Sequence, residues 1–273
     1  IAAIAPHAGY VYSGGVAGYT YKAIKDKAFK LVILIGPSHF ESFDGISVYN
    51  KGSFQTPLGN VEIDAESANR LIKENPKITF YPKAFDREHS LEVQLPFLQR
   101  TKKDFKIVPI LIGNPSFENC KILANAIVNV IEKRDDVIII ASTDLSHYHK
   151  YEEALTIDRF TLSELSKLEP ETIFTDYSNG SIELCGAGAV LTAVIASRAL
   201  GAKSLEILKY ANSGDTAGDM ARVVGYASGI FTGKSQEGDG EYMLNEKEEK
   251  KLLYIARHSI ESYLKNGAKP ALT

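Results

Sequence analysis

The chain has 273 residues, of which 44% are hydrophobic and 24% are charged, a balance that is typical of a soluble globular protein. A formal net charge of -3 gives no electrostatic reason to expect nucleic acid or an anionic membrane as a partner. Two cysteines are too few for a disulfide framework and favour a cytoplasmic location, and no apolar run approaches the ~18 residues that a membrane span needs.

Continuous runs of Val, Ile, Leu and Ala alternate with helical patterns along the first part of the chain. In chain order, the expected elements are a strand at 1–5, a helix at 16–25, a strand at 30–36, helices at 65–75 and 89–100, a strand at 106–112, a helix at 116–133, a strand at 137–142, helices at 151–168 and 186–200, and strands at 203–211 and 222–231. Unbroken apolar strands are buried on both faces, so we predict an α/β fold with a mostly parallel central sheet flanked by helices. Only a loop joins the last two strands, which predicts an antiparallel edge.

The composition changes after residue 231. Residues 232–242 are polar and rich in glycine, which predicts a linker. Residues 245–267 then form an amphipathic helical pattern with no obvious partner in the chain. We therefore expect one domain over 1–231 and the start of a second domain over 243–273.

Polar residues follow the ends of several predicted strands. His7 follows the first strand, His39 the second, and Asp144 and His147 the strand at 137–142, while an acidic loop at 212–219 follows a later strand. Ligands bind beyond the carboxyl ends of parallel strands, so we expect these side chains to share one crevice. Two histidines and a carboxylate suit a non-haem Fe(II) site, and a further histidine can act as acid or base.

Other interpretations of these motifs compete with a metal site. His89 either lines the crevice or only caps a helix, and Asp144 either binds metal, orients a histidine or caps a turn. Cys185 precedes a helix, where a thiolate is favoured, although a buried structural cysteine is the commoner outcome. The glycines of 13–18 do not have the G-x-G-x-x-G spacing of a dinucleotide site, and the G-x-S-x-G of a serine hydrolase is absent.

Several stretches together are distinctive: "APHAGYVYSG", "GPSHF", "EHSLEVQLPFL", "STDLSHY", "LCGAGAV" and "YANSGDTAGD" with "VVGYASG". They resemble the Memo family (mediator of cell motility), which includes protein B of the AmmeMemoRadiSam system, from residue 1 to about 231. Residues from about 240 onward resemble the opening of an AMMECR-type domain. This resemblance implies that an N-terminal segment is missing and that the second domain is truncated.

The resemblance also implies a fold like that of LigB-type class III extradiol dioxygenases, which use Fe(II) to open catechol rings. The family's two metal histidines map onto His7 and His39, and the dioxygenases' acid/base histidine maps onto His147. Some animal members have a cysteine as third ligand, at a position where this chain has Thr216. Asp215 beside it restores a carboxylate, which favours iron over a softer metal. The family as a whole has no settled reaction.

We therefore expect a metal-dependent redox protein, oxygenase-like, that acts on a small aromatic or otherwise planar substrate. The expected residues are, by role, the metal ligands His7, His39 and Asp215, the base His147 steered by Asp144, and the pocket residues Tyr10, Tyr12 and His89. The third ligand stays open between Asp215, Thr216 and Asp144. The alternative function is a binding module that holds a small molecule or peptide and partners a radical-SAM enzyme.

Overall fold

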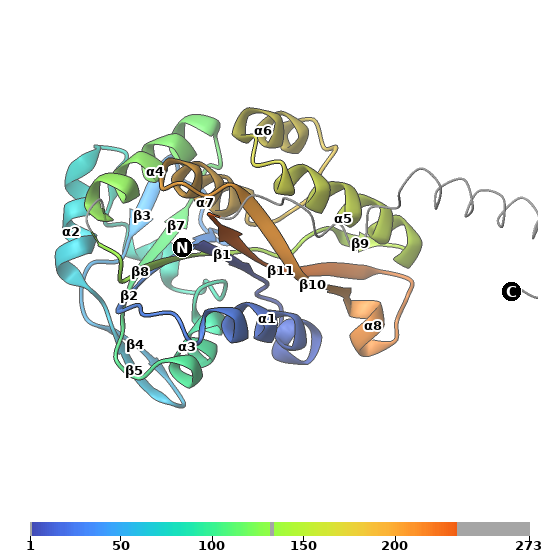
Figure 1. Ribbon diagram of the computed structural model, residues 1–273, viewed down its shortest axis with the longest axis horizontal. Coiled ribbons are helices and arrows are strands. Elements are labelled where there is room, and N and C mark those ends of the chain that lie inside the picture. Colours follow the sequence, from blue (N-terminus) through green and yellow to red (C-terminus); the bar gives the residue numbers. More distant parts are fainter. Residues whose placement is uncertain (1, 132–133, 234–273) are drawn as a thin grey trace, which may run out of the picture. The chain divides into compact units, whose positions relative to one another are not determined.

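The computed structural model describes residues 2–131 and 134–233, which Figure 1 shows as a coloured ribbon. The strands are β1 (Ala2–Ala5), β2 (Leu31–Pro37), β3 (Ile46–Val48), β4 (Ser53–Thr56), β5 (Gly59–Glu62), β6 (Ile78–Thr79), β7 (Lys106–Ile112), β8 (Val137–Ser142), β9 (His147–His149), β10 (Ser204–Asn212) and β11 (Val223–Thr232). The helices are α1 (Tyr10–Ile24), α2 (Ala65–Glu74), α3 (Leu95–Thr101), α4 (Phe117–Ile131), α5 (Tyr151–Ser166), α6 (Pro170–Ser178), α7 (Ala187–Ala199) and α8 (Ser213–Ala217), with short 3-10 helices η1 (Pro82–Phe85) and η2 (Glu92–Gln94).

A nine-stranded sheet organises the described part of the chain, in the order β10-β11-β1-β8-β2-β7-β3-β6, with β9 paired to β11. The four central strands β1, β8, β2 and β7 are mutually parallel. On one side β11 runs antiparallel to β1 and β10 antiparallel to β11, while on the other β3 runs antiparallel to β7. This arrangement confirms the expected fold class and the antiparallel edge formed by the last two predicted strands.

Both faces of the sheet are buried, as the unbroken apolar runs predict. Along β2, Leu31, Ile33 and Ile35 belong to one hydrophobic cluster, and Val32 and Leu34 belong to another. The first cluster lies beneath α4 and α7, and the second lies against α1 and α3. Successive side chains of a strand point to opposite faces, so a strand covered on both sides needs apolar residues at every position.

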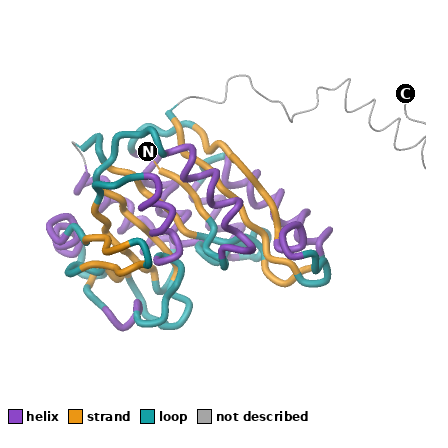
Figure 2. Tube along the Cα trace, turned by 90° about the horizontal axis from the view of Figure 1, so that it is seen from below, coloured by secondary structure: helices purple, strands orange, loops and turns teal. Residues whose placement is uncertain are grey.

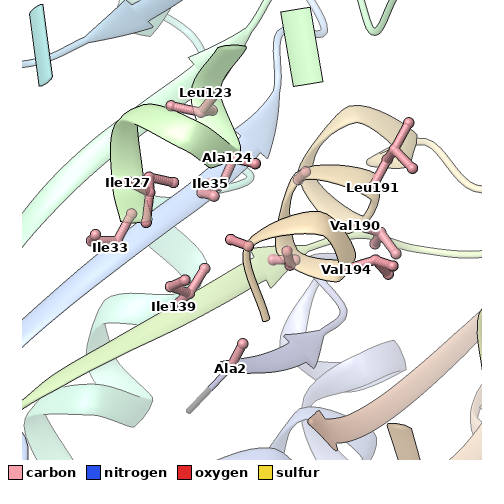
Figure 3. Packing of buried hydrophobic residues seen from close by; sticks show 14 of the residues in the cluster. Ala2, Ile33, Ile35, Leu123, Ala124, Ile127, Ile139, Val190, Leu191 and Val194 are labelled. Carbon is pink, nitrogen blue, oxygen red and sulfur yellow. The ribbon is translucent and has the colours of Figure 1, made fainter. Parts of the chain in front are cut away.

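The close packing of the first cluster is visible in Figure 3. Ile127 of α4 and Val194 of α7 lie above the strand residues Ile33 and Ile139, and all four side chains are almost completely buried. The second face, seen from below in Figure 2, also has helices lying along the strands. Burying one such aliphatic side chain stabilises the fold by about 1.5–3 kcal/mol, so these two layers hold the strand ends in fixed positions.

The predicted elements differ from the observed ones mainly where elements are short or rich in glycine. All six predicted strands lie within two residues of their observed bounds. Helix α1 starts at Tyr10 instead of residue 16, because Ser13, Val16 and Ala17 are buried and packing outweighs the low helix propensity of Gly14 and Gly15. The predicted helix at 89–100 is divided into η2 and α3, with a proline in the first turn of α3.

The C-terminal predictions concern residues that are largely not described. Thr232 is the last residue of β11, and the rest of the predicted linker beyond Gly233, the helix at 245–267 and the second domain at 243–273 lie outside the described residues. The Ser116 hydroxyl caps the N-terminus of α4, since it accepts a hydrogen bond from the Asn119 N–H at 3.2 Å. Among the described helices, none combines the length and apolar character needed to cross a bilayer.

Candidate metal centre

The carboxyl ends of β1, β8 and β2 meet at one edge of the sheet because these strands are adjacent and parallel. His7 lies two residues beyond β1, and His39 lies two residues beyond β2. Their ring centroids are 5.2 Å apart with an interplanar angle of 76°. The structure therefore brings together the two histidines that the sequence places at strand ends.

His89 is the third histidine of this group. Its ring lies 5.7 Å from that of His7 and 5.1 Å from that of His39. One ring nitrogen from each histidine lies within 4.8 Å of the others, and this is the one group of potential metal ligands found in the described residues. Gly36 permits the approach, since a Cβ there would stand 2.6 Å from the Ser90 hydroxyl next to His89.

Glu88 holds His39 through its carboxylate. One oxygen accepts from the His39 ring Nδ1 at 2.9 Å, and the other accepts from the His39 backbone N–H at 2.7 Å. Burial opposes the charge of Glu88, but these hydrogen bonds and one from the Ser90 N–H lower the pKa of the carboxyl to about 2. An ionised carboxylate only accepts, so Nδ1 of His39 carries a proton, and the lone pair of the neutral ring is then on Nε2.

His7 is almost fully buried, and its ring has three polar neighbours. Its Nδ1 lies 3.0 Å from the Ser142 hydroxyl, and its Nε2 lies 3.2 Å from the Cys185 sulfur and 4.0 Å from an oxygen of Asp144. Burial, reinforced by the nearby His39 and His89 rings, lowers the pKa of His7 to about 3. The imidazole is therefore neutral near pH 7, which is the form that binds metals.

The donor set fits a divalent transition metal. Three imidazoles converge within ligand distance of one another, and two of them have the outward Nδ1 held by a hydrogen-bond acceptor. Metal-bound histidines typically have this arrangement, with one ring nitrogen on the metal and the other donating to a carboxylate or another oxygen. Nitrogen ligands of this type suit zinc, copper, iron and nickel.

His147 and Asp144 follow β8, and their charges interact, but the expected hydrogen bond between them is not formed. The His147 Nδ1 lies 2.8 Å from the Leu145 carbonyl, and no hydrogen bond joins the His147 and Asp144 side chains in the described structure. One oxygen of Asp144 accepts from the backbone N–H groups of His7 and Ala8. Asp144 therefore orients the His7 loop, while a backbone carbonyl orients His147.

Asp215, the predicted third ligand, is not part of the histidine group. It lies in the first turn of α8 and forms a capping box with Asn212, whose N–H donates to it at 2.9 Å. Its other oxygen accepts from the Tyr151 hydroxyl at 2.7 Å. The Thr216 hydroxyl bonds the Ser213 carbonyl at 3.4 Å. His89, which was expected to line the pocket, is instead the third member of the group of potential metal ligands.

The remaining predicted residues lie near the group but differ in their contacts. Tyr10 and Tyr12 are exposed at the start of α1, and the Tyr10 hydroxyl donates to the Val93 carbonyl. Burial, with the nearby Asp144 carboxyl, raises the pKa of the Cys185 thiol to about 12. Cys185 is therefore a neutral thiol, which favours a structural role for this cysteine over a reactive thiolate.

Sequence reasoning missed Glu88, Ser142 and Gln94. A signal for Glu88 was present, because a glutamate directly beside His89 in a segment that reaches the strand ends is a natural partner for a metal-binding histidine. Ser142 is the last residue of the predicted strand at 137–142, and a serine at the end of a strand gives no sign of a functional role. Gln94 lies in a helical pattern, and only the packing of η2 against α1 and β8 gives it a role.

Comparisons with known proteins agree with this architecture. The chain is 42% identical over 228 residues to a MEMO1 family protein of Methanobrevibacter smithii, covering 83% of this chain and 81% of that protein. It is 39% identical over 236 residues to a MEMO1 family protein of Caldivirga maquilingensis, covering 85% and 83%. The fold is similar to the crystal structure of uncharacterized protein JW3007 from Escherichia coli K12, with a TM-score of 0.55 and 13% identity over 84% of this chain and 98% of that one. The family model described as Memo-like protein matches residues 1–230, and this chain therefore belongs to the Memo-like protein family.

Proposed function

We propose that this chain binds a divalent transition metal through His7, His39 and His89, and that the bound metal serves redox chemistry of the dioxygenase type on a small planar substrate. When bound, the metal would supply Lewis acidity and a redox-active centre. The observation that carries the proposal is the convergence of three ring nitrogens within 4.8 Å of one another at the carboxyl edge of the sheet.

The protonation of the site supports metal binding. His7 stays neutral across the physiological range because burial and two neighbouring rings disfavour its cation. Glu88 is ionised and accepts a hydrogen bond from the Nδ1–H of His39. A neutral His7 imidazole offers a nitrogen lone pair to a metal ion, and imidazole nitrogen suits divalent transition metals.

His147 is suited to act as the base. A carbonyl only accepts hydrogen bonds, so the contact with Leu145 O fixes the proton of a neutral His147 on Nδ1 and leaves the Nε2 lone pair free. His147 is only partly buried and can therefore meet a substrate proton. We assign it the proton-accepting role that its place after β8 predicts.

The surroundings of the site support a planar substrate. Phe40 is exposed, and its ring lies 6.4 Å from that of His39 and 6.3 Å from that of His89. Tyr148 is also exposed and lies beside His147, in the left-handed backbone region at a φ of 65°. Bulky residues rarely adopt this conformation, which costs on the order of 1 kcal/mol and is often found at functional sites.

Metal identity is part of the proposal, with iron as the first candidate. The sequence favoured iron because of an expected carboxylate ligand. Two carboxylates lie near the group: Asp144, 4.0 Å from Nε2 of His7, and Glu88, which already accepts from Nδ1 of His39. Three histidines without a carboxylate also suit zinc, which has no redox chemistry, so a preference for zinc would contradict the redox part of the proposal. A competition series with Fe(II), Zn(II) and Cu(II) under anaerobic conditions ranks these metals directly.

The test is calorimetric titration of the metal-free protein with Zn(II) and Fe(II). We expect one ion per chain, and we expect His7→Ala, His39→Ala and His89→Ala each to weaken binding by at least ~100-fold, because even an indirect partner of a metal ligand commonly contributes ~10–100-fold. His149→Ala is the matched control, since His149 pairs with Glu183 and lies outside the group.

Two results would contradict the proposal. Wild-type protein that folds but takes up no stoichiometric metal would favour the alternative, a ligand- or peptide-binding module that partners a radical-SAM enzyme. Equal loss of affinity in His149→Ala and in the three test variants would show that binding occurs elsewhere.

A further inference from the structure

We propose that Ser142 and Gln94 are positioning residues that fix the proton of His7 on Nδ1, and so present Nε2 to the metal. The presentation of Nε2 to a metal rests on the proposed function. The position of the proton on His7 is a property of the metal-free protein. The hydrogen-bond polarity of the network follows from groups that can act only as donors or only as acceptors.

The first step is the orientation of the Gln94 amide. One end lies 2.9 Å from the Pro6 carbonyl, which only accepts, so this end is the Nε2 donor. The other end, Oε1, must then accept, and it does so from the Tyr21 hydroxyl at 2.6 Å. A flipped amide would place Oε1 against the Pro6 carbonyl and lose that hydrogen bond, so the orientation is fixed. The second N–H of the amide donates to the Ser142 hydroxyl at 2.8 Å.

The second step is the direction of the Ser142 hydroxyl. Its oxygen lies 2.6 Å from the Ser90 carbonyl, another group that only accepts, so the single hydroxyl proton is donated there. The oxygen already accepts from Gln94 and has one acceptor site left. The contact with His7 Nδ1 at 3.0 Å must therefore run from the imidazole N–H to the serine oxygen.

The third step is the effect on His7. With the proton held on Nδ1, Nε2 is the unprotonated nitrogen, and it lies on the side of Cys185 and Asp144. Gln94, Ser142 and Ser90 are fully buried and Tyr21 and His7 almost so, which leaves little solvent to supply alternative partners. His39 has the same protonation pattern, but its partner is the Glu88 carboxylate instead of a neutral hydroxyl.

The experiment combines nuclear magnetic resonance of ¹⁵N-labelled histidine in the metal-free protein with Zn(II) titration, with the His7 signals assigned by their loss in His7→Asn. We expect wild-type His7 to carry its proton on Nδ1. In Ser142→Ala the proton should move at least partly to Nε2, and Zn(II) affinity should fall by ~10–100-fold. The matched control is Ser197→Ala, which removes a buried hydroxyl of α7 that has no hydrogen-bond partner in the described structure.

Each outcome decides the inference. A wild-type His7 protonated on Nε2 would overturn it, and this measurement needs no variant, so it stands even if Ser142→Ala fails to fold. Unchanged protonation and unchanged affinity in a folded Ser142→Ala would also overturn it. If wild-type protein shows the Nδ1 proton but binds no Zn(II), the positioning network is supported while the proposed function fails.

Discussion

His39 and His7 are held by partners of different charge. His39 donates to the ionised Glu88 carboxylate, and His7 donates to the neutral Ser142 hydroxyl. Hydrogen bonds to a charged group contribute about 1.5–3 kcal/mol, against about 0.5–1.5 kcal/mol between neutral groups. The stronger partner therefore holds His39, which is the more exposed of the two histidines and whose side chain is less restrained by packing.

Glu88→Gln should weaken Zn(II) binding by ~10–100-fold without unfolding the protein, because the neutral amide holds the His39 ring less firmly. Calorimetric titration measures the loss. Glu183→Gln is the control, since it changes a carboxylate that pairs with His149 outside the histidine group. Equal affinities in wild type and Glu88→Gln would show that the carboxylate does not support the metal ligand.

His149 should give the fold a small pH-dependent stabilisation. A hydrogen bond from the His149 ring to Glu183 raises the pKa of His149, with further support from Glu153. A raised folded-state pKa stabilises the native state fully below the unfolded value of 6.5, and this stabilisation is lost as pH rises through the folded value.

The measurement is urea denaturation of wild type and Glu183→Gln at pH 6 and at pH 9. The pair is partly exposed to solvent, so we expect a difference in unfolding free energy of at most about 1 kcal/mol at pH 6 and a smaller one at pH 9. A larger difference at pH 9 would contradict the assigned direction of the pKa shift.

The long elements were predictable from the sequence, and the short ones were not. The apolar runs of β1, β2, β7 and β8 predict strands that are buried on both faces of the sheet. The ends of β1 and β2 then give the positions of His7 and His39. Helix α8 has only five residues, too few for a periodic pattern, so its residues read as a loop that supplied a metal ligand. His89 could not be assigned as a ligand, because the packing of the chain after η1 against β2 places it there.

Asp215→Ala should leave Zn(II) affinity unchanged and lower the free energy of unfolding by about 0.5–2 kcal/mol, because it removes the N3 half of the capping box whose N-cap is Asn212. The reason is that both oxygens of Asp215 accept hydrogen bonds within the fold, from Asn212 N–H and Tyr151 OH. Chemical denaturation and metal titration of the same sample separate the two effects. A loss of affinity of ~100-fold or more would instead restore Asp215 as a metal ligand.

The described part of the chain derives its stability from two apolar layers on either side of one sheet. The two hydrophobic clusters and the nine-stranded sheet are built from residues up to Thr232. Composition and apolar runs were sufficient to predict this architecture. The pairing order β11-β1-β8-β2 was not predictable in the same way, because it depends on contacts between strands that are distant along the chain.

A chain ending at Gly233 should unfold in one cooperative transition with a melting temperature within about 4 °C of the parent, since for a domain of this size 1 kcal/mol corresponds to about 2–4 °C. Differential scanning calorimetry of both chains provides the comparison. Loss of soluble protein, or a much lower melting temperature, would show that the residues after 233 contribute to the stability of the sheet.

The central place of β1 has a consequence for the order of folding. Ala2 pairs with Ile139 on one side and with Phe231 on the other, so the first strand waits for partners that are synthesised much later. At about 5–20 residues per second, translation from β1 to the end of β11 takes roughly 10–50 s. Such a high contact order slows folding. His7 follows β1 directly, so we expect the candidate metal site to form only after both neighbours of β1, β8 and β11, have been synthesised. Under the proposed function, a bound metal ion would therefore identify a chain in which β1 has paired on both sides.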